Sequence, residues 1–505
     1  MPRKRGRGGG GSRGGGGGKG RSNREKFRGI EENTLAILEN SSTATSHHLL
    51  DDRLAFLQAV RSASLVPENG TAPTNKMLEA VFRILKDEDS LDLIVESYEL
   101  LLELNKRYPR VSLSLEVKSG SCPESEALSK LIVVEEAWCP FRRSEKEESS
   151  SSNGELIDSS SFHSLIEDIA EITSSRSCKE EMSRRASEES CRKLDLKSLR
   201  NMLLFHYLVS ILEGDFIART QAFKENMNWA LLRESILNVI LGSRKTSYKD
   251  LIKECLSLMC DLCRGLTEFA HDLRPNGSLA AELRNNIYFA VQLTLPEVET
   301  RTCNALKKLL LMIMDLDSSR NLADMSDLIS RADGVRTPAA EIILNELTYD
   351  GDILSPFFLA VDEPDWKLKL VVQFFQKYIP KSSARTRRSN GSASDVTFDG
   401  ILKCFSNQSI SKGVNKKIRA EVTQLLLAHA FKAYLSIASN QSAEDISGTK
   451  QDTGAGCLVE ICRNIISAFA CLQKDNKRCE LLEISKEALF TAGTIIAMNP
   501  TGISH

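Results

Sequence analysis

The chain has 505 residues, a net charge of −2, 41% hydrophobic and 6% aromatic residues. This length suits two or three domain-sized pieces, or one extended helical array with tails. The longest apolar run, at 309–314, is far shorter than the ~20 residues of a membrane-spanning helix, so no membrane partner is expected. The basic, Gly-rich N-terminus lacks the apolar segment of a secretory signal, so the thirteen cysteines are interpreted as reduced, mostly buried thiols.

Residues 1–30 are predicted to be a disordered, basic Gly/Arg-rich tail. Residues 1–29 carry ten Lys or Arg and one acid, a net charge of +9, which leaves about −11 on the remainder. They have almost no apolar side chain to bury, and glycine loses the most backbone entropy on folding. The tail is either a flexible leader or a segment for nuclear import or nucleic-acid contact, through the cluster Arg3, Lys4, Arg5 and Arg7.

Residues 31–141 are predicted to form an N-terminal helical region. A first helix would start at Asp51 or Asp52 and run to about Leu65, and a second is marked by apolar residues at 77, 81 and 85. A third would run from Ser90 to Pro109, with one apolar face made of Leu91, Val95, Tyr98 and Leu102. Residues 111–117 alternate with period two, which indicates a short strand or a loop edge.

Residues 142–193 are rich in Ser and Glu, and we expect a disordered, low-complexity insertion with one marginal helix near 162–172. Ser187 follows two arginines, a pattern typical of a basophilic-kinase site, although matches this short are commonly chance.

Residues 194–381 are predicted to be a central helical scaffold. Separate helices are expected at 251–266, 283–293 and 304–316. Two further apolar helical faces precede them: Leu196, Leu199, Leu203 and Tyr207, and then Trp229, Leu232, Ile236 and Ile240.

The densest folding signals lie at 333–381, where three short helices are predicted. The first would open at Thr337-Pro338, with the threonine hydroxyl as its cap, and the second at Ser355-Pro356. The third would open at Pro364 and bury a broad stripe, which includes Trp366. The stripe consists of Trp366, Leu370, Val371, Phe374, Phe375 and Tyr378.

A basic polar loop is predicted at 382–398, followed by a C-terminal helical region at 399–498. The loop is either simply solvated or a contact for phosphates or an acidic partner surface. Its basic cluster is Arg385, Arg387 and Arg388, preceded by Lys377 and Lys381. No clean internal repeat is found, so the predicted fold class is all-α, an irregular armadillo/HEAT-like helical stack.

One group of residues has metal-ligand chemistry: Cys255, Cys260, Cys263 and His271. Structural zinc needs two ligand pairs separated by turn residues, whereas these cysteines fall in a helical pattern. We therefore expect no metal site. Since no nucleophile, phosphate-loop or paired-carboxylate motif is found either, we expect no catalytic residue, no cofactor, no small-molecule substrate and no enzymatic activity.

Long segments, in order over about residues 31–498, resemble the plant negative regulators of systemic acquired resistance. They include LAFLQAVRSASLVPENGTAPTNKM from Leu54, EEAWCPF from Glu135, MNWALLRESILNVILGSRK from Met227, DGVRTPAAEIILNELTYDG from Asp333, WKLKLVVQFFQKYIPK from Trp366, ARTRR from Ala384, GILKCFSN from Gly400 and KEALFTAG from Lys486.

The resemblance implies an armadillo/HEAT-like nuclear scaffold that binds other proteins. It further implies a non-catalytic subunit of the structural-maintenance-of-chromosomes five–six complex, which acts in DNA repair by homologous recombination. It also implies repression of pathogenesis-related genes before infection, with chromatin or DNA as a partner that is possibly reached only through other subunits. The alternative function is a repressor that binds DNA or RNA directly through the basic tail and the loop Arg385–Arg388.

Overall fold

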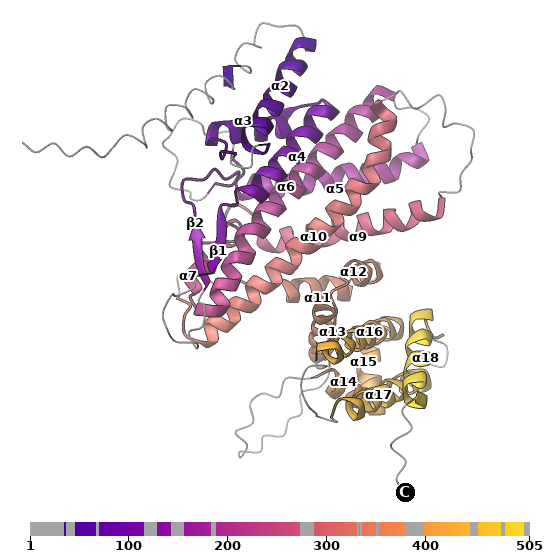
Figure 1. The fold of residues 1–505 in the computed structure, drawn as a ribbon. Helices are drawn as coiled ribbons and strands as arrows, with labels where there is room; N and C mark the ends of the chain where they lie inside the picture. The colour runs from indigo at the N-terminus through magenta and orange to yellow at the C-terminus, as the bar shows by residue number, and fades with distance from the viewer. Residues whose placement is uncertain are drawn as a thin grey trace, which may run out of the picture. The chain divides into compact units, whose positions relative to one another are not determined.

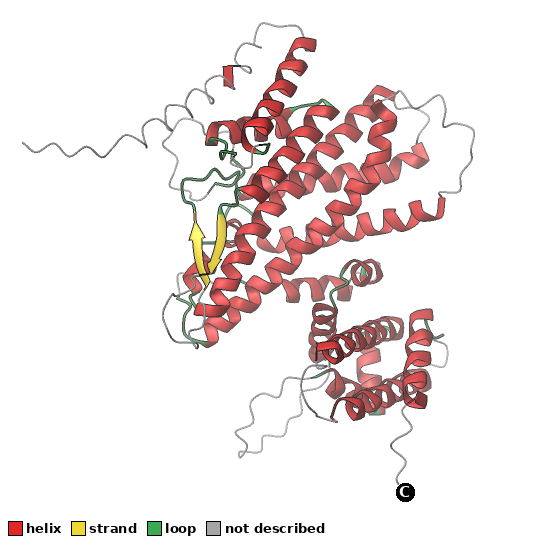
Figure 2. Ribbon diagram, viewed as in Figure 1, coloured by secondary structure: helices red, strands yellow, loops and turns green. Residues whose placement is uncertain are grey.

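The structure is a computed structural model, and it describes the residues 35–36, 46–66, 70–115, 129–142, 156–182, 188–272, 287–330, 333, 336–349, 353–378, 397–444, 453–475 and 480–498. Helices α2 to α18 make up nearly all of this described part, with one two-stranded sheet (Figures 1 and 2). The predicted all-α helical stack is therefore confirmed. Two compact units are present, Met1–Ser114 with Leu131–Leu156, and Leu115–Lys130 with Ile157–His505.

The first unit packs three helices beside the sheet's two short strands. Its core includes Phe56, Val81 and Leu101, all at most 1% exposed. The backbone N–H of Val134 donates to Arg110 O at 2.9 Å, which brings the end of one strand to the start of the other and makes the pair antiparallel. The elements are α2 (Ser46–Ser64), α3 (Asn75–Asp87), α4 (Leu91–Arg107), β1 (Val111–Leu115) and β2 (Ser129–Val133).

Two expectations for the first unit are corrected. Helix α2 starts at Ser46, so Asp51 and Asp52 lie inside it and do not open it. The buried face of α4 is also different, because Leu93, Ile94, Leu100, Leu101 and Leu104 are buried. Of the four residues predicted to share that face, only Tyr98 is buried. The short strand, in contrast, is confirmed as β1.

The second unit begins with a bundle of long helices. Helix α10 packs along α6 and α9, and α5 also packs on both of these helices (Figure 1). A buried ion pair on α6 fixes the following turn, since Asp215 accepts from Arg219 Nε at 3.0 Å and from Ile236 N at 2.9 Å. The bundle's helices are α5 (Ser159–Met182), α6 (Glu188–Asn226), α7 (Trp229–Arg233), α8 (Ile236–Leu241), α9 (Tyr248–Asp272) and α10 (Ile287–Met325).

Within the predicted insertion at 142–193, the one helix expected near 162–172 is confirmed, but it is longer than expected and firmly packed, so the expectation of disorder is wrong at Ser159–Met182. Helix α5 fills Ser159–Met182 and buries Phe162, Ile166 and Ile169, each at most 1% exposed. The run of serines made this helix look marginal in the sequence. At its start, Asp158 accepts a hydrogen bond from Ser161 N at 2.9 Å and so caps the helix.

Two helix boundaries in the bundle also differ from expectation. Separate helices were predicted at 283–293 and 304–316, whereas Ile287–Met325 form one helix, α10, which continues through Pro296. Conversely, residues 229–240 form α7 and α8 instead of one helix, with Ser235 capping α8 by accepting from Asn238 N at 3.2 Å. All four predicted face residues of this stretch are buried.

The block at 333–381 contains the three short helices that were predicted, α11 (Ala339–Tyr349), α12 (Leu354–Ala360) and α13 (Pro364–Tyr378). Thr337 was expected to cap α11, but it does not bind the first amide of this helix. Thr337 is exposed, and Ala339 N donates to the carboxylate of Asp317 on α10 at 2.8 Å. A residue distant in sequence therefore stabilises this helix start.

The remaining helices pack around α13 and α16. Helix α13 lies on α16, while α17 packs on α14, α15 and α18. In the described part of the chain, no helix is both long and apolar enough for a membrane span. These helices are α14 (Phe398–Phe405), α15 (Gln408–Lys417), α16 (Ala420–Glu444), α17 (Thr453–Asp475) and α18 (Glu483–Met498).

Candidate functional site: a groove along α13

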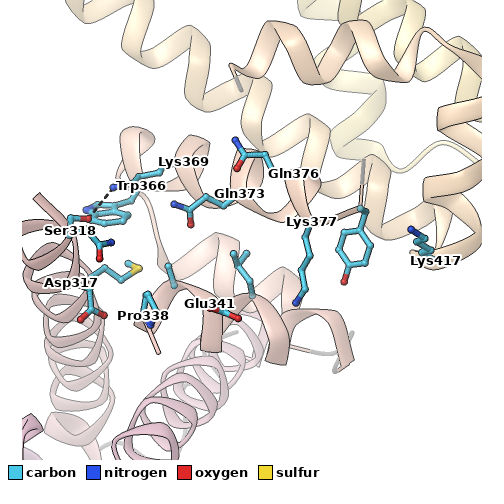
Figure 3. A pocket seen from close by; sticks show the side chains of 15 residues that line it. Asp317, Ser318, Pro338, Glu341, Trp366, Lys369, Gln373, Gln376, Lys377 and Lys417 are labelled. Atoms are coloured by element: carbon cyan, nitrogen blue, oxygen red, sulfur yellow. Dashed lines mark hydrogen bonds between the residues drawn. The ribbon is translucent and has the colours of Figure 1, made fainter. Parts of the chain in front are cut away.

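An open groove of about 770 Å³ runs along one side of α13 (Figure 3). Its other walls come from α10, α11 and the end of α15. We name it the α13 groove. Its lining residues are Met314, Asp317, Ser318, Asn321, Pro338, Ala340, Glu341, Leu344, Trp366, Lys369, Gln373, Gln376, Lys377, Tyr378 and Lys417.

The sequence of α13 divides the helix into a core face and a groove face. Leu370, Val371, Phe374 and Phe375 are all at most 1% exposed and anchor the helix. The groove residues recur at positions 366, 369, 373, 376 and 377, the spacing of three and four residues that aligns side chains along one face of a helix. Because the core face is tightly packed, the groove face is held in a fixed orientation.

Trp366 lies at one end of the groove and is only half-buried, so its predicted place in the core is wrong. The Lys369 ammonium lies 4.4 Å from the centroid of its ring and donates to Ser318 Oγ at 3.2 Å (Figure 3). The lysine thus covers one face of an indole that would otherwise meet water, a cation–π arrangement.

The opposite end of the groove is basic. Lys377 and Lys417 are both exposed there (Figure 3). Tyr378 also lines the groove, and Lys377 donates to the amide oxygen of Asn345. With Lys369, three lysines line the groove, against the exposed carboxylate of Glu341 and the buried one of Asp317.

The carboxylate of Asp317 is already engaged in the wall of the groove. It accepts from Arg336 Nε at 2.9 Å and from the Tyr248 hydroxyl at 3.0 Å, in addition to Ala339 N. Burial, and then the charge of Asp317, raise the pKa of the Tyr248 hydroxyl, so the phenol stays protonated and remains the donor. The outward charge of the α13 groove is therefore predominantly positive.

A second hollow, of about 550 Å³, lies on another side of α13 and is largely apolar. Leu368 and Val372 of α13 line it together with Phe398, Tyr434 and Ile461. Lys369 lines both hollows, so α13 has a mixed, basic hollow on one side and a largely apolar hollow on the other.

A smaller pocket of about 360 Å³ between α6 and α10 is also lined by cations, but acids neutralise them. Lys308 lies 2.9 Å from Glu213, and Lys307 lies 3.4 Å from Glu363. Arg301 lies 2.6 Å from Glu297. This pairing makes the pocket a weaker candidate for an anionic partner than the α13 groove.

The residues predicted from sequence to contact nucleic acid or a partner lie outside the described part of the chain. This holds for Arg3, Lys4, Arg5, Arg7, Arg385, Arg387 and Arg388, and for the predicted phosphorylation site Ser187. Of the wider basic cluster named with the loop, Lys377 is described, and it lies in the α13 groove.

The cysteines considered as zinc ligands are helix-packing residues where they are described. Cys255 and Cys260 are fully buried, and Cys260 donates to Ile353 O at 3.6 Å. Burial raises the pKa of Cys260 to about 12 and that of Cys303 to about 11, so both remain protonated thiols at neutral pH. The side chain of His271 lies outside the described residues.

Known proteins match this chain over most of its length. Residues 110–363 match the domain family described as "SNI1 middle domain", and residues 379–500 match the "SNI1 C-terminal domain". The chain is also 40% identical over 469 residues to the Negative regulator of systemic acquired resistance SNI1 of Arabidopsis thaliana, covering 92% of this chain and 94% of the relative. The protein is thus an all-helical regulator of plant defence. It belongs to the SNI1 family of negative regulators of systemic acquired resistance.

The family domains meet at α13. The middle domain ends at residue 363 and the C-terminal domain starts at residue 379, so α13 occupies the interval between them. The α13 groove is lined from the middle domain by α10 and α11 and from the C-terminal domain by Lys417. Binding sites occur preferentially where domains meet, which makes this groove the leading candidate site.

Proposed function

We propose that this chain is a non-catalytic nuclear scaffold that restrains systemic acquired resistance by holding partner proteins. Specifically, it would be a subunit of the structural-maintenance-of-chromosomes five–six complex, acting in DNA repair by homologous recombination and in repression of pathogenesis-related genes. Family membership supports the regulatory part of this proposal. The resemblance noted in the sequence motivates the complex, the nucleus and DNA repair.

The single structural observation that supports a scaffold is the α13 groove. It has an open surface, a half-buried tryptophan at one end and exposed lysines at the other. Tryptophan is enriched among the residues that dominate protein–protein binding energies, while exposed charges steer and orient the partner.

The partner surface that fits this groove is acidic with an apolar side chain. Carboxylates would face Lys377 and Lys417, and an apolar group would pack against Trp366. Because α13 lies between the two family domains, a bound partner would contact both of them at once.

The test is affinity purification of tagged full-length protein from plant nuclei, with the double variant Lys377→Glu/Lys417→Glu beside wild type. Wild type should co-purify with chromosome-maintenance subunits, and the double variant should lose them. Loss of binding is interpreted only if circular dichroism and thermal melting match those of wild type.

A matched control is Lys416→Glu/Lys474→Glu, which makes the same charge change at exposed positions outside the groove. This control should retain the subunits. If both double variants co-purify with the same subunits as wild type, the groove does not hold the partner. If wild type brings down no such subunit, membership of the complex is refuted.

A direct DNA- or RNA-binding repressor is the alternative, motivated by the net +9 charge of residues 1–29. Phosphate contacts make affinity fall steeply with salt. Equal, salt-insensitive DNA affinity of the full chain and a truncation starting at Ile30 would remove the tail from the function.

A further inference from the structure

Three side chains of α5 and α9 bring metal-ligating atoms together, away from the α13 groove. His163 and Glu167 are one turn apart on α5, and Glu254 lies on α9. One ligand atom from each lies within 4.8 Å of the other two. We propose that these three residues form a binding site for a divalent transition metal of the zinc class, which joins α5 to α9.

The pair at the centre of this cluster is in direct contact, closer than two ligands of one ion, so a bound metal would replace this contact and move the two atoms apart. His163 Nε2 lies 2.6 Å from Glu254 Oε2, and both atoms are sealed from solvent. Neither atom has a well-aligned hydrogen-bond partner. Buried polar atoms normally have one, so a ligand that both atoms could bind would remove this deficit.

The charge around the cluster favours a dication over an ion pair alone. Glu167 and Glu254 bring two carboxyl groups to the same point as a single imidazole. A divalent ion would compensate the negative charge of the two carboxylates and join all three side chains.

The ligand types select the metal. An imidazole nitrogen with two carboxylates suits zinc and its first-row neighbours, whereas magnesium and calcium prefer oxygen ligands alone. Ligand atoms of tetrahedral zinc are roughly 3.4 Å apart, given bonds of about 2.0–2.2 Å. Glu167 is exposed, so its side chain is free to close the remaining distance, and water would complete the coordination.

A metal at this site would also anchor α5. Helix α5 packs on both α6 and α9, and the metal would add a bond between α5 and α9 at the solvent edge of that contact. A ligand that binds only the folded state raises its stability according to its concentration and affinity.

The experiment is zinc titration of chelator-treated full-length protein by isothermal calorimetry at pH 7.5, with melting temperature measured with and without zinc. We expect one zinc per chain at this site and a higher melting temperature. Glu167→Gln changes an exposed side chain, so it should fold normally and still lower the zinc affinity by roughly tenfold or more. His163→Ala and Glu254→Gln should abolish binding at this site.

Two controls separate this site from others in the chain. Glu234→Gln makes the same change at an exposed position outside the cluster and should bind zinc as wild type does. Cobalt replaces zinc as a spectroscopic probe, because cysteine ligation gives intense thiolate-to-metal bands that a nitrogen and oxygen site lacks. The proposal is overturned if no zinc binds, if binding is unchanged in Glu167→Gln and His163→Ala, or if only thiolate bands appear. His163 and Glu254 would then form an ion pair only.

Discussion

At the scale of single residues, Asp317 links three segments of the second unit. Its side chain accepts from Tyr248 of α9, from Arg336 and from Ala339 at the start of α11. The Arg336 guanidinium also lies 5.0 Å from the centroid of the Tyr248 ring. The carboxylate therefore stabilises a helix N-terminus and a buried cation together, directly behind the α13 groove.

Replacing Asp317 with alanine should reduce the free energy of unfolding by about 3–5 kcal/mol, because Arg336 would keep a largely buried charge without its carboxylate. Urea unfolding followed by circular dichroism measures the change. Asp324→Ala, at an exposed position on the same helix, should stay within about 0.5 kcal/mol of wild type. Equal loss in both variants would contradict the role assigned to Asp317.

His429 is a second residue with a defined environment. Its ring stacks on Phe358 at 5.1 Å, and burial, with Lys367 and Lys432 adding to it, lowers its pKa to about 4. The unfolded chain would protonate this histidine near pH 6.5, whereas the folded chain resists until about pH 4. The unfolded state thus binds more protons between these values, and stability falls as pH drops through this window.

His429→Leu should remove this part of the pH dependence. Wild type should lose up to about 3 kcal/mol from this group between pH 7 and pH 4, and the variant should show a correspondingly smaller decrease. Urea midpoints at pH 7, 6 and 5 measure the difference in slope. Identical slopes for the two proteins would show that the ring is solvated.

At the scale of elements, α5 shows how sequence composition can conceal structure. Its serine-rich start indicated low complexity, yet Phe162 stacks on Phe205 of α6 at 6.0 Å. The buried apolar residues recur every three or four positions, at 162, 165, 166, 169 and 172, and they pack on α6 and α9.

Phe162→Ala should therefore cost about 3–5 kcal/mol of stability, as expected for a fully buried aromatic residue. Ser164→Ala, at an exposed position one residue beyond His163, should be nearly neutral. Thermal and urea unfolding of the two variants decide the matter. A neutral Phe162→Ala would return this segment to the class of a dispensable insertion.

The presence of most helices was predictable from the sequence, while the face that a helix buries and its full length were not. Turn and proline signals correctly placed the starts of α12 and α13 near Ser355 and Pro364, because such signals act locally. The face of α4 was mispredicted because all its leucines look alike in sequence, and packing partners decide which are buried. Separate helices were expected at 283–293 and 304–316, yet α10 continues through Pro296 where it packs along α6 and α9.

The candidate site was predictable only in part. Lys377 was singled out as part of a basic cluster, and it lies in the α13 groove, while its contact with a partner stays a prediction. Trp366 was assigned to the core because aromatic spacing does not distinguish a buried position from a groove edge. The groove as a whole joins residues from 314 to 417, and no local pattern brings such distant positions together.

At the scale of the whole molecule, α13 occupies the interval between the two family domains, and the groove draws its walls from both. A partner in this groove would bind both domains and the intervening helix as one surface. Our central claim is that occupation of the α13 groove is required for restraint of plant defence.

The most direct measurement is the expression of pathogenesis-related genes in uninfected plants whose only copy of this protein is Lys377→Glu/Lys417→Glu. Protein abundance is matched to wild type, and Lys416→Glu/Lys474→Glu plants serve as the charge-matched control. We predict raised basal expression in the groove variant and wild-type repression in the control. Full repression in the groove variant at equal protein abundance would contradict the account.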